Sequence, residues 1–117
     1  MQPDHQQRYT AALEAYRFQR RGTKPDAHWR AMLLIATATE GLWAKVEPYL
    51  EIRLGNAWLG RLCEEVDLSG GERRLMSLAR NLFAGEGTVD VSDLINTLDD
   101  DMWQVAIEAV KIRRGEA

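Results

Sequence analysis

The chain has 117 residues, 45% of them hydrophobic, and a formal net charge of −3 at pH 7. This length and apolar content suffice to bury one hydrophobic core, so we expect a single domain over residues 1–117. The composition excludes an intramolecular disulfide and a cysteine metal cluster, because Cys63 is the only cysteine. No apolar run is long enough to cross a bilayer and none resembles a signal peptide, so we expect a cytoplasmic protein.

Helix-start signals divide the first forty residues into two expected helices. Asp4 is the expected N-cap of the first helix, which ends at Gly22. A peripheral position for this segment, residues 1–22, is one arrangement that the sequence allows. Asp26 starts the second helix, which extends to about Thr39 and is the most apolar of the chain. We therefore expect the second helix at the centre of the domain.

The middle of the chain is less regular. We expect Glu40-Gly41 to break the second helix and a short helical segment to follow. Residues 49–54 alternate apolar and polar side chains, which is typical of a strand. The only candidate for a partner strand is the short segment 89–91, so we favour irregular or helical structure for residues 49–54.

Residues 68–74, Leu-Ser-Gly-Gly-Glu-Arg-Arg, match the signature motif of ABC ATPases, in which helix amides and the serine hydroxyl contact the γ-phosphate of ATP. The chain has no P-loop, because none of its lysines follows a glycine, and no segment supplies the Walker B acids. The same residues form a capping box, with Ser69 as N-cap and Glu72 three residues later, ahead of apolar residues at helical spacing. We therefore interpret the motif as the start of a helix over residues 69–84 and expect no cofactor.

Further short helices complete the expected fold. One covers residues 58–66, and Ser92 is the expected cap of another. Asp99 or Asp100 caps the last helix, whose final turn carries basic side chains that suit the helix dipole. These elements predict an all-α fold, a compact bundle of six or seven short helices with one irregular or extended segment near residues 49–54.

Charge is distributed unevenly along the chain. Residues 1–30 carry six basic and three acidic side chains, whereas residues 86–108 carry seven acids and no base. Such asymmetry indicates charged partner surfaces or attraction between the two ends of the chain. The candidate interaction surface comprises Glu86, Asp90, Asp93, Asp99, Asp100, Asp101 and Trp103. The candidate basic patch comprises Arg17, Arg20, Arg21, Lys24 and Arg30.

Metal and nucleic-acid sites have weaker support in the sequence. The run Asp99-Asp100-Asp101 lies in no glycine-containing calcium loop, and acids in a first helical turn are favourable without a metal. His5 and His28 have no ligand partners at metal spacing, so we expect no metal. The last two helices can be drawn as a helix-turn-helix, but phosphates would repel the three aspartates that begin its second helix. Nucleic-acid binding is therefore not expected and would rest on the basic patch alone.

A further set of segments spans about two-thirds of the chain, from Leu34 to Gly115. Its strongest parts are Leu68-Ser69-x-x-Glu72-Arg73-x-Leu75, Leu78-Ala79-x-Asn81-Leu82-Phe83, and Leu98-Asp99-Asp100 with Ala106-Ile107-Glu108-Ala109; Met32-Leu33-Leu34-Ile35, Leu42-Trp43 and Pro48-Tyr49-Leu50 add to them. Together these segments resemble a family of small uncharacterised helical proteins carried by phages and prophages, mainly in Gram-positive and actinobacterial lineages. The resemblance implies an all-helical fold and a mobile-element origin. It implies no activity and no functional residues.

These observations lead us to expect a non-enzymatic phage or prophage accessory protein that acts by protein–protein interaction. Its partner would be a host factor or a component of a phage assembly, and a homo-oligomer is compatible with this role. Its location would be the host cytoplasm or the virion, without membrane contact. The alternative is a regulatory module that binds nucleic acid or a nucleotide through the basic N-terminal region or the helix N-terminus at Ser69.

Overall fold

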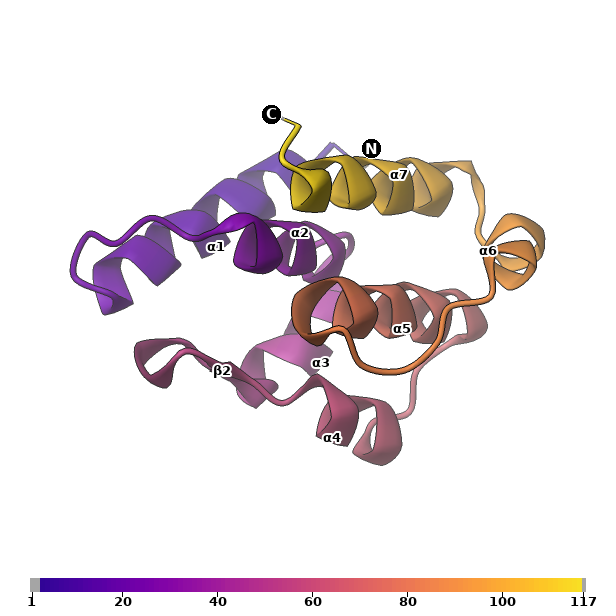
Figure 1. Cartoon of the computed structure of the whole chain (residues 1–117), viewed down its shortest axis with the longest axis horizontal. Coiled ribbons are helices and arrows are strands. Elements are labelled where there is room, and N and C mark those ends of the chain that lie inside the picture. Colours follow the sequence, from indigo (N-terminus) through magenta and orange to yellow (C-terminus); the bar gives the residue numbers. More distant parts are fainter. Residues whose placement is uncertain (1–2, 117) are drawn as a thin grey trace.

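The computed structural model describes residues 3–116, which fold mostly as α-helices (Figure 1). The helices are α1 (His5–Gln19), α2 (Ala27–Ala36), α3 (Glu40–Val46), α4 (Leu59–Glu65), α5 (Gly70–Ala84), α6 (Val91–Thr97) and α7 (Asp100–Arg114). The radius of gyration is 13.1 Å, close to the value of about 13 Å for a compact domain of this length. The predicted compact bundle of short helices is confirmed. No helix within residues 3–116 has the length and apolar character needed to cross a membrane.

The helix α2 lies at the centre of the domain, between α7 and α5 (Figure 1). Every residue from Ala31 to Ala36 is buried, so this helix presents no hydrophilic face over that stretch. A helix that is apolar on all sides is stable only when other elements surround it. The prediction that the most apolar segment is central is therefore confirmed.

The end of α2 differs from the sequence prediction. The helix ends at Ala36, and the Thr37 hydroxyl donates back to the carbonyl of Leu33 over 2.7 Å. Thr39 then adopts an extended conformation, and its hydroxyl accepts a hydrogen bond from the Leu42 amide. Glu40-Gly41 therefore begins α3 and does not break α2. The prediction missed that Thr39 is an N-cap, which gives α3 a start signal of its own.

The first helix packs along α2 through its buried side chains. Ala12 and Tyr16 are buried, and the Tyr16 ring lies 5.1 Å from that of Trp29. At the other end of α1, the Arg8 guanidinium donates to the carbonyls of Thr37 over 2.9 Å and of Ala38 over 3.1 Å. These contacts attach both halves of α1 to the central helix.

His5 is also part of this attachment. Its ring is buried, and its Nε2 lies 2.7 Å from the carbonyl oxygen of Leu34, so Nε2 carries the proton. The Nδ1 atom is buried and has no hydrogen-bond partner in residues 3–116. Burial lowers the pKa of His5, although the bond to Leu34 opposes this shift. Protonation would place an unsolvated charge in the core, so burial and the bond to Leu34 give His5 a structural role.

Residues 47–57 form two 3₁₀ turns and a two-stranded ribbon. The turns are η1 (Glu47–Tyr49) and η2 (Ile52–Leu54), and the strands are β1 (Leu50–Glu51) and β2 (Asn56–Ala57). The strands pair antiparallel, Leu50 with Ala57 and Glu51 with Asn56. The segment near 49–54 thus contains extended structure, but its partner is β2 and not residues 89–91. Gly55 adopts a positive φ of 74° between η2 and β2, a conformation that glycine reaches without steric strain because it has no Cβ atom.

The helices of the second half begin largely as predicted. Ser69 caps α5, and Asp99 caps α7 by accepting a hydrogen bond from the Met102 amide over 2.8 Å. The prediction that Ser92 caps α6 is wrong. Asp90 is the N-cap, since its carboxylate accepts from the Asp93 amide, and Ser92 lies within the first turn of the helix. Asp and Ser are both common at N-caps, so their identities alone do not tell whether Asp90 or Ser92 is the cap; the position at which the chain enters the helix decides it.

Candidate interaction surfaces

The signature-like loop before α5 is held by bonds within the protein. The Ser69 hydroxyl accepts a hydrogen bond from the Glu72 amide over 3.2 Å, and Glu72 Oε1 accepts one from the Ser69 amide over 2.9 Å. Lys45 Nζ from α3 lies 2.8 Å from the same Oε1. Burial of Glu72 opposes its ionisation, but the bonds from Lys45 and Ser69 outweigh burial and lower the pKa of this carboxyl. The predicted capping box is confirmed, and it also joins α3 to α5.

The second glycine of the motif has a packing role. A Cβ atom at Gly71 would lie 2.7 Å from Met102 Sδ and 3.2 Å from its Cε, at the start of α7. No real Cβ approaches a heavy atom so closely, so a side chain at this position would displace Met102. The glycine therefore allows the first turns of α5 and α7 to pack closely. Ser69, Gly71 and Glu72 of the motif thus have structural roles in this fold.

The helix α6 lies at one end of the long axis of the molecule, and α7 begins beside it (Figure 1). This arrangement brings together five of the predicted acidic residues, Asp90, Asp93, Asp99, Asp100 and Asp101. We call this region, residues 90–101, the acidic end. Asp90 and Asp99 serve as N-caps, and Asp93 lies 3.7 Å from an amino nitrogen of Arg74 on α5.

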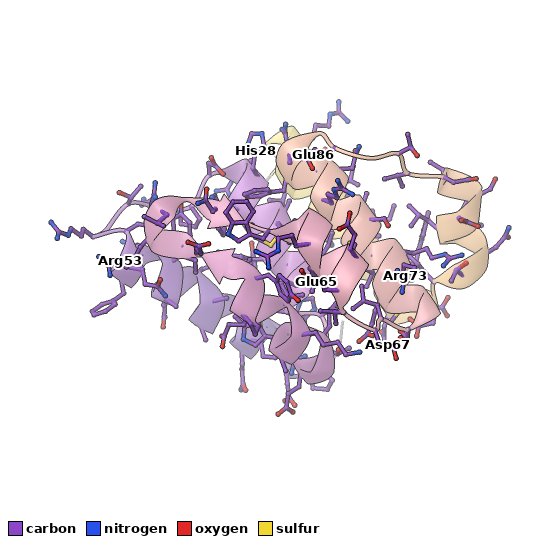
Figure 2. The ribbon with its side chains drawn as sticks, turned by 90° about the horizontal axis from the view of Figure 1, so that it is seen from below. His28, Arg53, Glu65, Asp67, Arg73 and Glu86 are labelled. Atoms are coloured by element: carbon purple, nitrogen blue, oxygen red, sulfur yellow. The ribbon has the colours of Figure 1, made fainter. Side chains whose placement is uncertain are left out.

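The two other predicted members of that surface are Glu86 and Trp103. Figure 2 shows Glu86 near the middle of the long axis, away from α6, and its carboxylate accepts two hydrogen bonds from Arg80, over 3.1 and 3.2 Å. Trp103 is half-buried on α7. Trp58 is the most exposed tryptophan of the described residues, and its indole nitrogen donates to Glu51. Glu86 is therefore set apart from the aspartates of the acidic end, whereas Trp103 lies next to them, since its amide donates to the carbonyl of Asp99 over 2.8 Å.

Sequence reasoning missed an apolar feature of the acidic end. Val91 and Ile95, one helical turn apart on α6, are each 60% exposed, whereas Leu94 is buried. The spacing of these three side chains would ordinarily predict that all of them face the core. Because α6 is short and contacts the domain through Leu94, the other two remain in solvent. They give the acidic end two exposed apolar side chains among aspartates.

A cleft of about 330 Å³ separates α6 from α5. It is lined by Arg73, Arg74, Ser77, Thr88, Val89, Asp90, Asp93 and Leu94. Arg74 Nε is buried there and has no hydrogen-bond partner in the described part of the chain. Since both charge signs line this cleft, its electrostatics favour neither an anionic nor a cationic ligand.

The opposite end of the long axis carries basic residues. The C-terminal part of α1 and the β1–β2 loop meet there, and Figure 2 shows Arg53 at the end away from α6. Arg20, Arg21 and Arg53 line one hollow of about 340 Å³ together with Gln19 and Thr23. Arg20 holds the two segments together, because one of its amino groups lies within 3.4 Å of the carbonyls of Ile52 and Arg53.

We call Arg17, Arg20, Arg21, Lys24 and Arg53 the basic end. Arg53 was not predicted, since only the tertiary fold brings it to Arg20 and Arg21. The predicted member Arg30 lies elsewhere, on α2; burial raises the pKa of Tyr9 on α1, and Arg30 opposes this shift. No acidic residue occurs between residues 15 and 25, although Glu14 and Asp26 flank that stretch and Glu51 lies two positions before Arg53.

Two further properties distinguish the basic end. Phe18 is 87% exposed and Leu54 69% exposed, so this end also carries large apolar side chains in solvent. Arg21 has a φ of 53°, the only positive value at a non-glycine position in residues 3–116. Left-handed backbone costs an L-residue on the order of 1–2 kcal/mol, and glycine is the usual residue where a helix ends this way. An arginine is therefore held at a position where glycine would be more stable.

The remaining candidates are Cys63 and the potential metal ligands. Cys63 is half-buried, and burial raises the pKa of its thiol, with Glu64 contributing less and two arginines opposing. A thiol shifted in this direction is a poor nucleophile. Within residues 3–116, no three His, Cys, Asp or Glu side chains gather closely enough to hold a metal ion.

Comparison of the chain with protein-family models, with curated proteins and with solved structures found no significant match.

Proposed function

We propose that this chain is a non-enzymatic phage or prophage accessory protein, in the host cytoplasm or the virion, that acts by contact with another protein through its acidic end. One observation carries the proposal: Val91 and Ile95 project into solvent from a helix that aspartates flank. Exposed apolar side chains within a polar rim are typical of protein interfaces. The partner surface would offer apolar side chains beside basic ones.

Affinity capture with a matched pair of variants tests this proposal. The double variant Val91→Asn/Ile95→Asn removes both apolar side chains and leaves the aspartates in place. Val110→Asn is the control, since Val110 on α7 is also exposed but lies outside the acidic end. We expect the wild type and the control to retain the same stoichiometric partner and the double variant to lose it. A partner retained equally by all three proteins would contradict the proposal.

A second candidate function is the binding of nucleic acid through the basic end. The juxtaposition of Arg20, Arg21 and Arg53 around one hollow favours it, because clustered arginines bind phosphates. A mobility-shift assay over a range of salt concentrations is the test. We expect Arg21→Gln/Arg53→Gln to weaken binding and to reduce its salt dependence, whereas Arg61→Gln on α4 leaves both unchanged. Absence of binding by the wild type at low salt would exclude this function.

A further inference from the structure

The acidic end and the basic end are complementary to each other. Each exposes two large apolar side chains, Val91 and Ile95 on one and Phe18 and Leu54 on the other. Five aspartates accompany the first pair, and five basic residues accompany the second. Complementary potentials steer association and fix which surfaces meet.

The two ends cannot meet within one molecule. The domain measures 41 × 29 × 25 Å, and the two ends lie at opposite extremes of the longest dimension (Figure 1). A contact between them must therefore join two molecules. The surface that the acidic end requires, apolar side chains beside basic ones, is present on every copy of this chain.

We propose that the acidic end binds the basic end of a second copy, so that the protein associates head to tail. This inference rests on the proposed function, because it names the partner of the acidic end. A head-to-tail contact leaves one free end of each kind, and each added copy restores the same pair of ends. The product is an open chain of molecules, or a ring where the rotation between copies closes, and not a closed dimer.

The interface would be small and sensitive to salt. The cross-section of the domain is 29 × 25 Å, so an end-to-end contact offers at most about the 800 Å² per partner of a standard protein interface. The charged side chains around this contact are exposed, so salt at moderate ionic strength screens their attraction. Weak, reversible association that increases with protein concentration is therefore expected. The left-handed Arg21 fits this role, since strained residues concentrate at functional surfaces.

Sedimentation velocity of the purified, nuclease-treated protein provides the first test. At low salt we expect the average mass to rise above the 13.3 kDa of the monomer and to continue past twice that value as concentration increases. At high salt we expect the monomer. A wild type that stays monomeric at all concentrations, or that stops at a dimer, would overturn the proposal. Association that requires added nucleic acid would also overturn it.

A mixing experiment tests the direction of the contact. Val91→Asn/Ile95→Asn disables the acidic end, and Arg21→Glu/Arg53→Glu disables the basic end. We expect each variant alone to be monomeric and their mixture to form a 1:1 dimer that grows no further, because only one intact end of each kind remains. The control Val110→Asn should behave as the wild type. Circular dichroism checks that each variant is folded, and the salt dependence of the wild type requires no variant.

The outcomes separate this inference from the proposed function. If the wild type is monomeric throughout but the acidic-end variant still loses a captured partner, the proposed function stands and self-association is excluded. If two disabled variants fail to combine although the wild type associates, the contact is not head to tail and the inference fails.

Discussion

The starts of α5 and α6 use the same local bond, yet the two helices are held very differently. In each, the N-cap side chain accepts a hydrogen bond from the amide three residues later, Ser69 from Glu72 and Asp90 from Asp93. The helix α5 then buries four side chains, whereas α6 buries Leu94. Local hydrogen bonding thus determines where a helix begins. Apolar residues over several turns determine how firmly it is packed.

The largest expected effect on stability comes from shortening a buried leucine, and it should differ between α5 and α6. Leu75→Ala should lower the free energy of unfolding by about 2–5 kcal/mol, because Leu75 is fully buried between packed helices. Leu94→Ala should cost less, about 2 kcal/mol or below, since a short helix can unfold locally without the rest of the domain. Urea unfolding measures both values, and amide exchange should increase only within residues 91–97 in Leu94→Ala. Equal costs for the two variants would show that α6 is packed as firmly as α5.

The next largest effect on stability concerns the two serines that the sequence predicts as N-caps, Ser69 and Ser92. Ser69→Ala should cost about 1 kcal/mol, because it removes the acceptor for the Glu72 amide. Ser92→Ala should change stability by less than about 0.5 kcal/mol, since Asp90 is the cap of α6. Thermal unfolding of both variants measures the difference. A cost at Ser92 as large as that at Ser69 would contradict the assignment of Asp90.

A smaller effect concerns the dependence of the α5 cap on pH. The pKa of Glu72 is lowered from its ordinary value of 4.5 in the folded protein. Its stabilising contribution is therefore fully present above about pH 4.5 and is lost as the pH falls through the lower, folded value. Glu72→Gln should be less stable than the wild type at pH 7, and the difference should shrink as the pH is lowered towards 3. Unfolding curves at several pH values test this, with Glu64→Gln as the exposed control.

The smallest effect is expected at the exposed side chains of α6. Val91→Asn/Ile95→Asn should alter the free energy of unfolding by no more than about 0.5 kcal/mol, because neither side chain lies in the core. Chemical denaturation measures it. A loss above about 2 kcal/mol would place these residues in the packing of the fold and remove them as a contact surface.

The features that are predictable from the sequence are those that depend on the spacing of residues within one segment. Ser69 and Glu72 were recognised as a capping box, and α2 as the central helix, because each signal lies within a few turns of one segment. The position of Arg53 beside Arg20 was not predictable, since 33 residues separate them and only the packed fold brings them together. The close approach of Gly71 to Met102 was likewise not predictable, because Met102 belongs to another helix.

The hydrogen bonds from Arg8 have a consequence for how the domain folds. The carbonyls just beyond α2 receive their donors from a side chain about thirty positions earlier. A helix end without donors leaves polar groups unsatisfied in the core, so α2 cannot complete its bonding until α1 has docked. We therefore expect the two helices to form one cooperative folding unit.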